Sequence, residues 1–144
     1  MNWRALIALT SLSLAACGGG ESTGPADDYA RVAGSYTLVS LDGRPLPATV
    51  FQDASTRIDV TSATLVLRAD RTFTETLDGQ IRQGGGQPQP ERQVHNGTFT
   101  LSGTAAAFTV PAAGGLPALG FAGTLSGTVL TYTDDLATYR YERR

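Results

Sequence analysis

Residues 64–77 read TLVLRADRTFTETL, and this stretch decides the class of fold. Leu65, Val66 and Leu67 form an apolar run before the turn-like residues 69–71, and Phe73 and Leu77 alternate with threonines after them. A period of two is typical of a strand with one buried face, and the β-branched threonines favour the same state. The stretch therefore predicts a β-hairpin.

The same pattern extends from this hairpin in both directions. Residues 35–41 end at Asp42-Gly43, a strong turn pair, and the two prolines of 44–47 predict a loop. Further loops are expected at 84–90 and 111–117, where glycine and proline gather. The predicted strands are 35–41, 64–68, 72–77 (with 80–83 as an extension), 94–101, 105–110, 118–125, 128–133 and 136–142.

These eight runs predict an all-β domain, an antiparallel up-and-down meander. A meander leaves two unpaired edges unless its first strand pairs with its last. We therefore expect a closed barrel, and the alternative is an open two-sheet sandwich, which shows the same alternation.

Composition agrees with one small β domain and excludes some functions. The chain has 144 residues, 41% of them hydrophobic, with 17 glycines and 17% charged residues. This mix favours short strands and many turns. The formal net charge is −2 and no basic stripe occurs, so we expect no nucleic-acid partner. No lysine is present, which excludes lysine-based catalysis.

The N-terminus has the order of a bacterial export signal. Arg4 gives a positive start, and residues 5–14 are apolar but too few to span a bilayer. Leu14-Ala15-Ala16-Cys17 follows and resembles the bacterial lipobox. The resemblance implies cleavage before Cys17, with a diacylglyceryl group on its thiol that anchors the protein in a membrane. Residues 1–16 are then a lipoprotein signal peptide.

The residues after Cys17 predict a tether. Residues 18–28 are rich in glycine and polar side chains, so we expect 17–30 to be a lipidated flexible linker with an end-to-end distance of roughly 20 Å. The barrel domain would then span 31–144. Gly18 stands where inner-membrane lipoproteins of enteric bacteria carry Asp, so the resemblance favours the outer membrane, facing the periplasm or the cell surface.

Residues 34–47 read GSYTLVSLDGRPLP and resemble the opening strand of lipocalin-like bacterial lipoproteins, with Tyr36 at a Trp/Tyr position. A META-type domain opens similarly, but the Gly-Cys-Asn segment usual in it is missing here, so that family ranks second. A lipocalin-like barrel implies a small apolar ligand. The candidate ligand residues are Phe73, Phe99, Phe108, Phe121 and Tyr36. The same side chains equally suit a filled barrel.

The sequence predicts neither an enzyme nor a cofactor or metal site. His95 is the only histidine, no nucleophile elbow accompanies it, and we expect it to be exposed in a strand or loop, beside a turn or bulge at Asn96-Gly97. Asp134-Asp135 is expected to be a turn. Glu75 shares a strand face with Phe73 and could point inward towards Arg140, but the expectation is a wet side chain near a barrel end.

Two functions follow as hypotheses. The first is a membrane-anchored envelope lipoprotein that holds a small apolar ligand in its barrel. The second is a structural or assembly lipoprotein that contacts another envelope protein through the loop at 84–90 or through an unpaired sheet edge.

Overall fold

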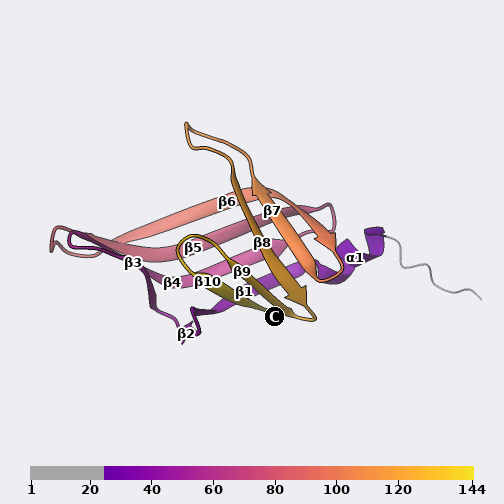
Figure 1. Cartoon of the computed structure of the whole chain (residues 1–144), viewed down its shortest axis with the longest axis horizontal. Coiled ribbons are helices and arrows are strands. Elements are labelled where there is room, and N and C mark those ends of the chain that lie inside the picture. The colour runs from indigo at the N-terminus through magenta and orange to yellow at the C-terminus, as the bar shows by residue number, and fades with distance from the viewer. Residues whose placement is uncertain (1–24) are drawn as a thin grey trace, which may run out of the picture.

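The computed structural model describes residues 25–144, and the predicted signal peptide and Cys17 lie outside this range. One helix and ten strands follow in chain order (Figure 1). They are α1 (Pro25–Val32), β1 (Gly34–Leu41), β2 (Arg44–Pro45), β3 (Ala48–Gln52), β4 (Thr56–Leu67), β5 (Thr72–Gln83), β6 (Gln89–Ser102), β7 (Ala105–Val110), β8 (Leu119–Ser126), β9 (Val129–Thr133) and β10 (Thr138–Arg143).

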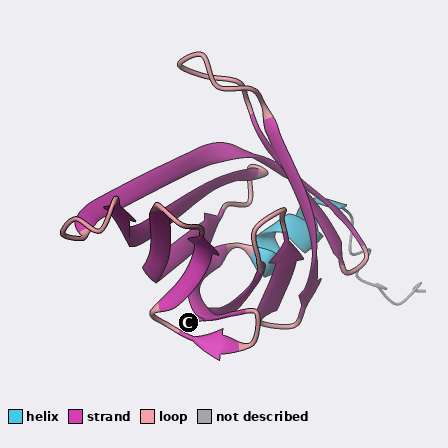
Figure 2. Ribbon diagram, turned by 60° about the vertical axis from the view of Figure 1, so that its left-hand side comes forward, coloured by secondary structure: helices cyan, strands magenta, loops and turns pink. Residues whose placement is uncertain are grey.

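Eight of the strands form a closed antiparallel barrel (Figure 2). β4 to β10 pair in sequence order, and β1 closes the ring because it pairs with both β4 and β10. Tyr36 is the point of closure, opposite Leu65 on one side and Arg143 on the other. The predicted closed meander is confirmed, and the open sandwich is excluded.

The eight predicted runs are the eight barrel strands, but four local expectations are wrong. β6 begins at Gln89, inside the predicted loop 84–90, because it pairs with β5 from there onward. The pair Arg44–Pro45 forms the short strand β2 at the edge of β1, where a proline is tolerated. β4 begins at Thr56, eight residues before the predicted start. Asn96-Gly97 lies inside β6 opposite Phe73 and Thr74, and it forms neither a turn nor a bulge, because β5 pairs with β6 without a register shift on both sides of it.

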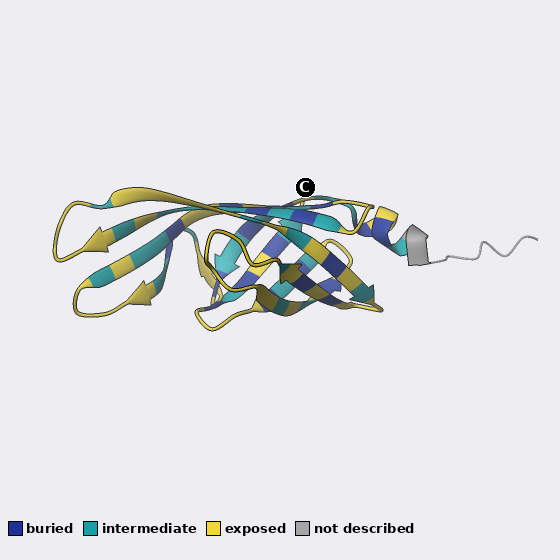
Figure 3. Ribbon diagram, turned by 90° about the horizontal axis from the view of Figure 1, so that it is seen from above, coloured by how far each residue is buried: buried dark blue, intermediate teal, exposed yellow. Residues whose placement is uncertain are grey.

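β3 and the distal parts of β4, β5 and β6 continue beyond the ring as a projecting sheet (Figure 3). β5 pairs with β6 from Thr72 to Ile81, whereas β7 covers only the last residues of β6, from Thr98. Within the described residues, the edge of β6 before Thr98 and the outer edge of β3 have no partner strand. Closure of the barrel therefore leaves no unpaired strand edge in the ring, but two unpaired edges remain on the projecting sheet.

A ladder of five aromatic rings forms much of the barrel interior. Neighbouring ring centroids lie 5.9, 4.8, 4.5 and 4.7 Å apart along this ladder. Its members, one each from β6 to β10, are Phe99, Phe108, Phe121, Tyr132 and Tyr139. Cross-strand aromatic contacts add to the free energy gained by burying the rings, so the ladder fixes the inward face of five strands.

α1 closes one end of the barrel, and it corrects the predicted linker. Pro25 suits a first helical position, and Arg31 in the last turn complements the helix dipole. Tyr29 is buried against Phe99, with its hydroxyl accepting a hydrogen bond of 3.1 Å from the Leu101 N–H. The expectation of an irregular tether is therefore wrong for 25–30, which belong to the folded domain.

Candidate functional site

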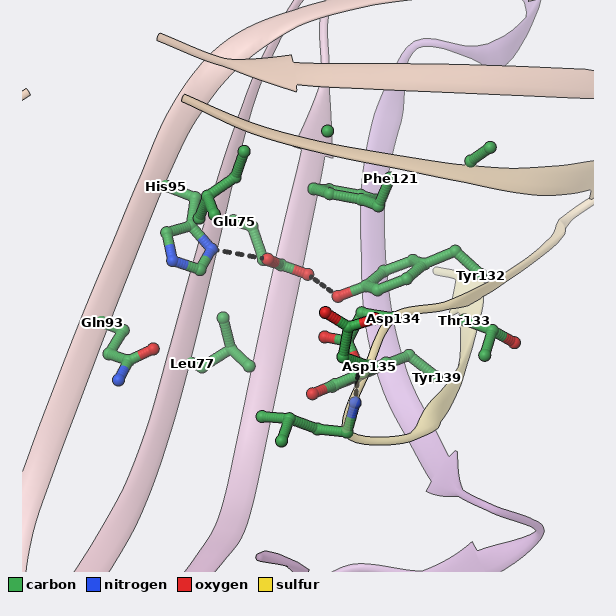
Figure 4. A pocket seen from close by; sticks show the side chains of 14 residues that line it. Glu75, Leu77, Gln93, His95, Phe121, Tyr132, Thr133, Asp134, Asp135 and Tyr139 are labelled. Carbon is green, nitrogen blue, oxygen red and sulfur yellow. Dashed lines mark hydrogen bonds and ion pairs between the residues drawn. The ribbon is translucent and has the colours of Figure 1, made fainter. Parts of the chain in front are cut away.

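A cavity of about 600 Å³ lies at the end of the barrel opposite α1. β10 fixes this placement, because the turn before it lines the cavity while Arg143 at its other end donates a hydrogen bond to the Arg31 carbonyl of α1. Side chains of β5, β6, β8, β9 and β10 form the wall (Figure 4). The size and the concave shape match a site for a small organic molecule.

Glu75 forms the floor of the cavity and is only 1% exposed. Its Oε1 accepts hydrogen bonds from the hydroxyls of Tyr132 and Tyr141, at 2.6 and 2.7 Å. Its Oε2 lies 3.0 Å from Nδ1 of His95. A carboxylate only accepts hydrogen bonds, so Nδ1–H is the donor of this third bond. We call these four residues the Glu75 network.

The Glu75 network corrects two expectations. Glu75 is neither wet nor paired with Arg140, whose guanidinium lies 2.6 Å from Glu142 instead. His95 is half-buried in β6 directly opposite Glu75, and its side chain is 27% exposed. The sequence did contain a signal for the position of His95. His95 lies four residues before Phe99 in the same strand, so the two side chains share the inward face.

The pKa shifts in the Glu75 network keep the proton on each of the three groups that donate to Glu75. The hydrogen bond to Glu75 raises the pKa of His95, against the opposing effect of burial, and the negative charges of Glu75 and Asp134 add to the rise. Burial, with the nearby carboxylate, raises the pKa of the Tyr132 and Tyr141 hydroxyls far above the ordinary value. Both hydroxyls therefore stay protonated and donate to Glu75.

Of the five predicted ligand residues, only Phe121 lines the cavity. Phe73, Phe99 and Phe108 are fully buried between the cavity and α1. Tyr36 is also fully buried, and its hydroxyl donates a hydrogen bond of 2.8 Å to the Val32 carbonyl. The half of the barrel next to α1 is thus filled by side chains, and the other half holds the cavity.

The entrance carries two carboxylates and two exposed leucines. Asp134 and Asp135 form the predicted turn between β9 and β10, where Oδ1 of Asp134 accepts hydrogen bonds from the backbone N–H groups of Leu136 and Ala137 at 2.8 and 2.9 Å. Leu119 and Leu136 are about half exposed beside them. No arginine lines the cavity in the part of the chain that the structure describes.

Other kinds of site are not found among residues 25–144. No group of three or more His, Cys, Asp or Glu side chains in this range is arranged to hold a metal ion. In the same range, no helix has the length and apolar character needed to cross a membrane.

The comparisons with known proteins give no family. No family model matches the sequence, and no curated protein or solved structure is significantly similar to it. The lipocalin-like and META-like resemblances stay predictions, and the site must be interpreted from its own geometry.

Proposed function

We propose that the protein is a lipid-anchored envelope protein that binds a small organic ligand in the cavity at the open end of its barrel. The observation that carries the proposal is the cavity of about 600 Å³, with an apolar wall and a few oriented polar groups. Leu77, Leu119 and Phe121 supply apolar surface, while Glu75 at the floor holds His95 in the wall. Small-molecule sites in proteins have this combination.

The membrane anchor is the part of the proposal that rests on Leu14-Ala15-Ala16-Cys17. Metabolic labelling of a bacterial host with an alkynyl fatty acid tests it. We expect label and membrane association on the wild-type chain, and neither on Cys17→Ala. A labelled Cys17→Ala chain, or an unlabelled wild type, would contradict the anchor but not the binding function.

Ligand binding is tested by native mass spectrometry of the full chain, purified in detergent from its own host. We expect an added mass that is lost on denaturation. Leu119→Trp should reduce it, because the larger side chain fills the entrance. Leu116→Trp is the matched control, since Leu116 lies in the loop just before β8, is 72% exposed and does not line the cavity. Equal occupancy in both variants would place the ligand elsewhere.

A second candidate function, contact with another envelope protein, is favoured by the projecting sheet. Phe51 on β3 and Val94 on β6 are exposed apolar side chains beside its two unpaired edges. Such edges can pair with a strand of another chain. In situ cross-linking from position 94, with position 100 as a control on the part of β6 covered by β7, tests this. Equal cross-linking at both positions would count against a specific contact.

A further inference from the structure

The distribution of charge in the cavity points to the class of ligand, provided that the proposed binding function holds. Asp134 and Asp135 line the entrance, and Figure 4 shows their side chains on the Tyr139 side, across the cavity from His95. Within residues 25–144, neither aspartate forms an ion pair. Carboxylates elsewhere do pair with arginine within 3.5 Å, namely Asp28, Asp42, Asp59, Asp78 and Glu142.

The residues at the floor of the cavity supply no net positive charge that would balance the two aspartates. Both oxygens of Glu75 are taken by donors of its own network, and any positive charge on His95 is balanced by Glu75, 3.0 Å away. The uncompensated charge of the cavity is therefore that of the two aspartates. A concave site with low-dielectric walls focuses such a field and attracts ligands of opposite charge.

The field of Asp134 acts on the other cavity groups. Burial is the main cause that raises the pKa of Tyr139, and the negative charge of Asp134 adds to it. The same carboxylate contributes to the raised pKa of His95 on the opposite wall. The two backbone N–H groups bound to Oδ1 hold Asp134 in place, so its charge is a fixed part of the entrance.

The size and the wall of the cavity argue against a bare inorganic cation as the ligand. A space of about 600 Å³ is suited to an organic molecule, and no cluster of metal ligands occurs among the described side chains. Leu77 and Phe121 line the same cavity and are less exposed than the aspartates, so they offer a ligand apolar contacts. An apolar body with a charged end matches both regions.

We propose that the ligand is a small organic cation, an amine with an aromatic or aliphatic body, whose ammonium group pairs with Asp134 and Asp135 while its body packs against Leu77, Leu119 and Phe121. The aspartates set specificity in this arrangement. The Glu75 network is a positioning element that holds the floor and does not bind the ammonium group.

Three probes with one apolar body test the charge preference: naphthylethylamine, naphthylethanol and naphthylacetate. Each is titrated calorimetrically into the full chain in matched detergent buffer. We expect the amine to bind about tenfold more tightly than the alcohol, as one charge-assisted contact implies, and the acid to bind most weakly. The advantage of the amine should shrink as salt is added, because the entrance is solvent-exposed.

Two variants separate the effect of the aspartate charges on binding from their effect on the structure of the turn. In the double variant Asp134→Asn, Asp135→Asn, an asparagine can still accept the hydrogen bonds of the turn, so we expect the protein to fold. Its affinity for the amine should decrease to its affinity for the alcohol. Asp53→Asn is the control, because Asp53 accepts the same kind of backbone bonds from Ser55 and Thr56, away from the cavity. The Asp53→Asn variant should bind the amine more tightly than the alcohol by the same factor as wild type.

Each outcome has a defined meaning. Equal affinity for the three probes, or an amine preference that survives the double variant, overturns the cation assignment while leaving a binding cavity. Binding of no probe, together with no effect of Leu119→Trp on host-derived ligand, overturns the proposed binding function as well.

Discussion

At the scale of single residues, the Glu75 network determines how the barrel tolerates a carboxylate in its interior. An unpaired buried charge would be very unfavourable, and even a paired one gains little unless every lone pair is satisfied. Here three donors from β6, β9 and β10 converge on one side chain of β5. No buried side-chain nitrogen or oxygen in the described residues lacks a hydrogen-bond partner.

Removing the charge of Glu75 should weaken the fold more than removing one donor. We expect Glu75→Gln to lower the free energy of unfolding by about 3 kcal/mol, and Tyr132→Phe by about 1.5 kcal/mol. Denaturant unfolding followed by circular dichroism measures both. Asp78→Asn, which breaks an exposed ion pair with Arg92, is the control and should change stability by less than about 1 kcal/mol. An equal effect of Asp78→Asn and Glu75→Gln would contradict a special role for the network.

The raised pKa of His95 makes stability depend on pH in one direction. The folded state binds the imidazole proton more tightly than the unfolded state, so the contribution is fully present below the ordinary pKa of 6.5 and is lost as pH rises through the folded value. We therefore expect wild type to lose stability relative to His95→Gln as pH increases above 6.5. Parallel stability curves for the two proteins would show that His95 is not linked to folding.

At the scale of elements, β6 depends on a glycine where three strands approach closely. A Cβ atom on Gly97 would overlap the Thr109 carbonyl of β7 and would lie 2.8 Å from Cε1 of Phe73 on β5. Neither neighbour moves easily, since one is backbone and the other is a fully buried ring. The position explains why Asn96-Gly97, a turn signal in isolation, is part of a strand here.

Gly97→Ala should therefore destabilise the barrel, by about 2 kcal/mol if overpacking follows its usual range. Gly120→Ala in β8 is the matched control, because the nearest atom to its added Cβ would be the Phe108 carbonyl at 3.8 Å, an ordinary contact. The midpoint of thermal unfolding compares the two variants. A smaller drop for Gly97→Ala than for Gly120→Ala would show that β6 can shift to make room.

At the scale of the whole molecule, β1 closes the ring and α1 closes one end of it. Tyr36 links these features, since it lies between β4 and β10 and donates to the Val32 carbonyl. The other end stays open because the projecting sheet leads away from the barrel there, with the β9–β10 turn and the start of β8 at the entrance. A closed ring and a one-sided plug together produce the cavity.

Hydrogen exchange should distinguish the ring from the projecting sheet within one strand. In β6, residues 98–102 pair with β7, whereas 89–96 have no partner on that side. We expect faster exchange in the second segment, because its strand edge is open to local unfolding and solvent. Peptide-resolved mass spectrometry of the full chain measures this. Uniform protection along β6 would indicate that another chain covers the edge.

Much of the local structure could be read from the sequence. Alternation around 64–77 and the turn pairs after each run located all eight barrel strands, because side-chain period and turn chemistry are properties of neighbouring residues. The same reasoning missed β3, the early start of β4, and α1, whose eight residues look like linker until Tyr29 packs against Phe99. Marginal local signals of this kind depend on tertiary contacts.

The sequence by itself determined an all-β meander, and it predicted a lipidated N-terminus at Cys17. Only the tertiary structure decided which strands close the ring, which half of the interior is filled and what surrounds Glu75. The physical reason is register: Glu75 meets His95, Tyr132 and Tyr141 across 20, 57 and 66 residues of chain. Such encounters depend on how the strands align with one another, and the alternation within each strand does not specify that alignment.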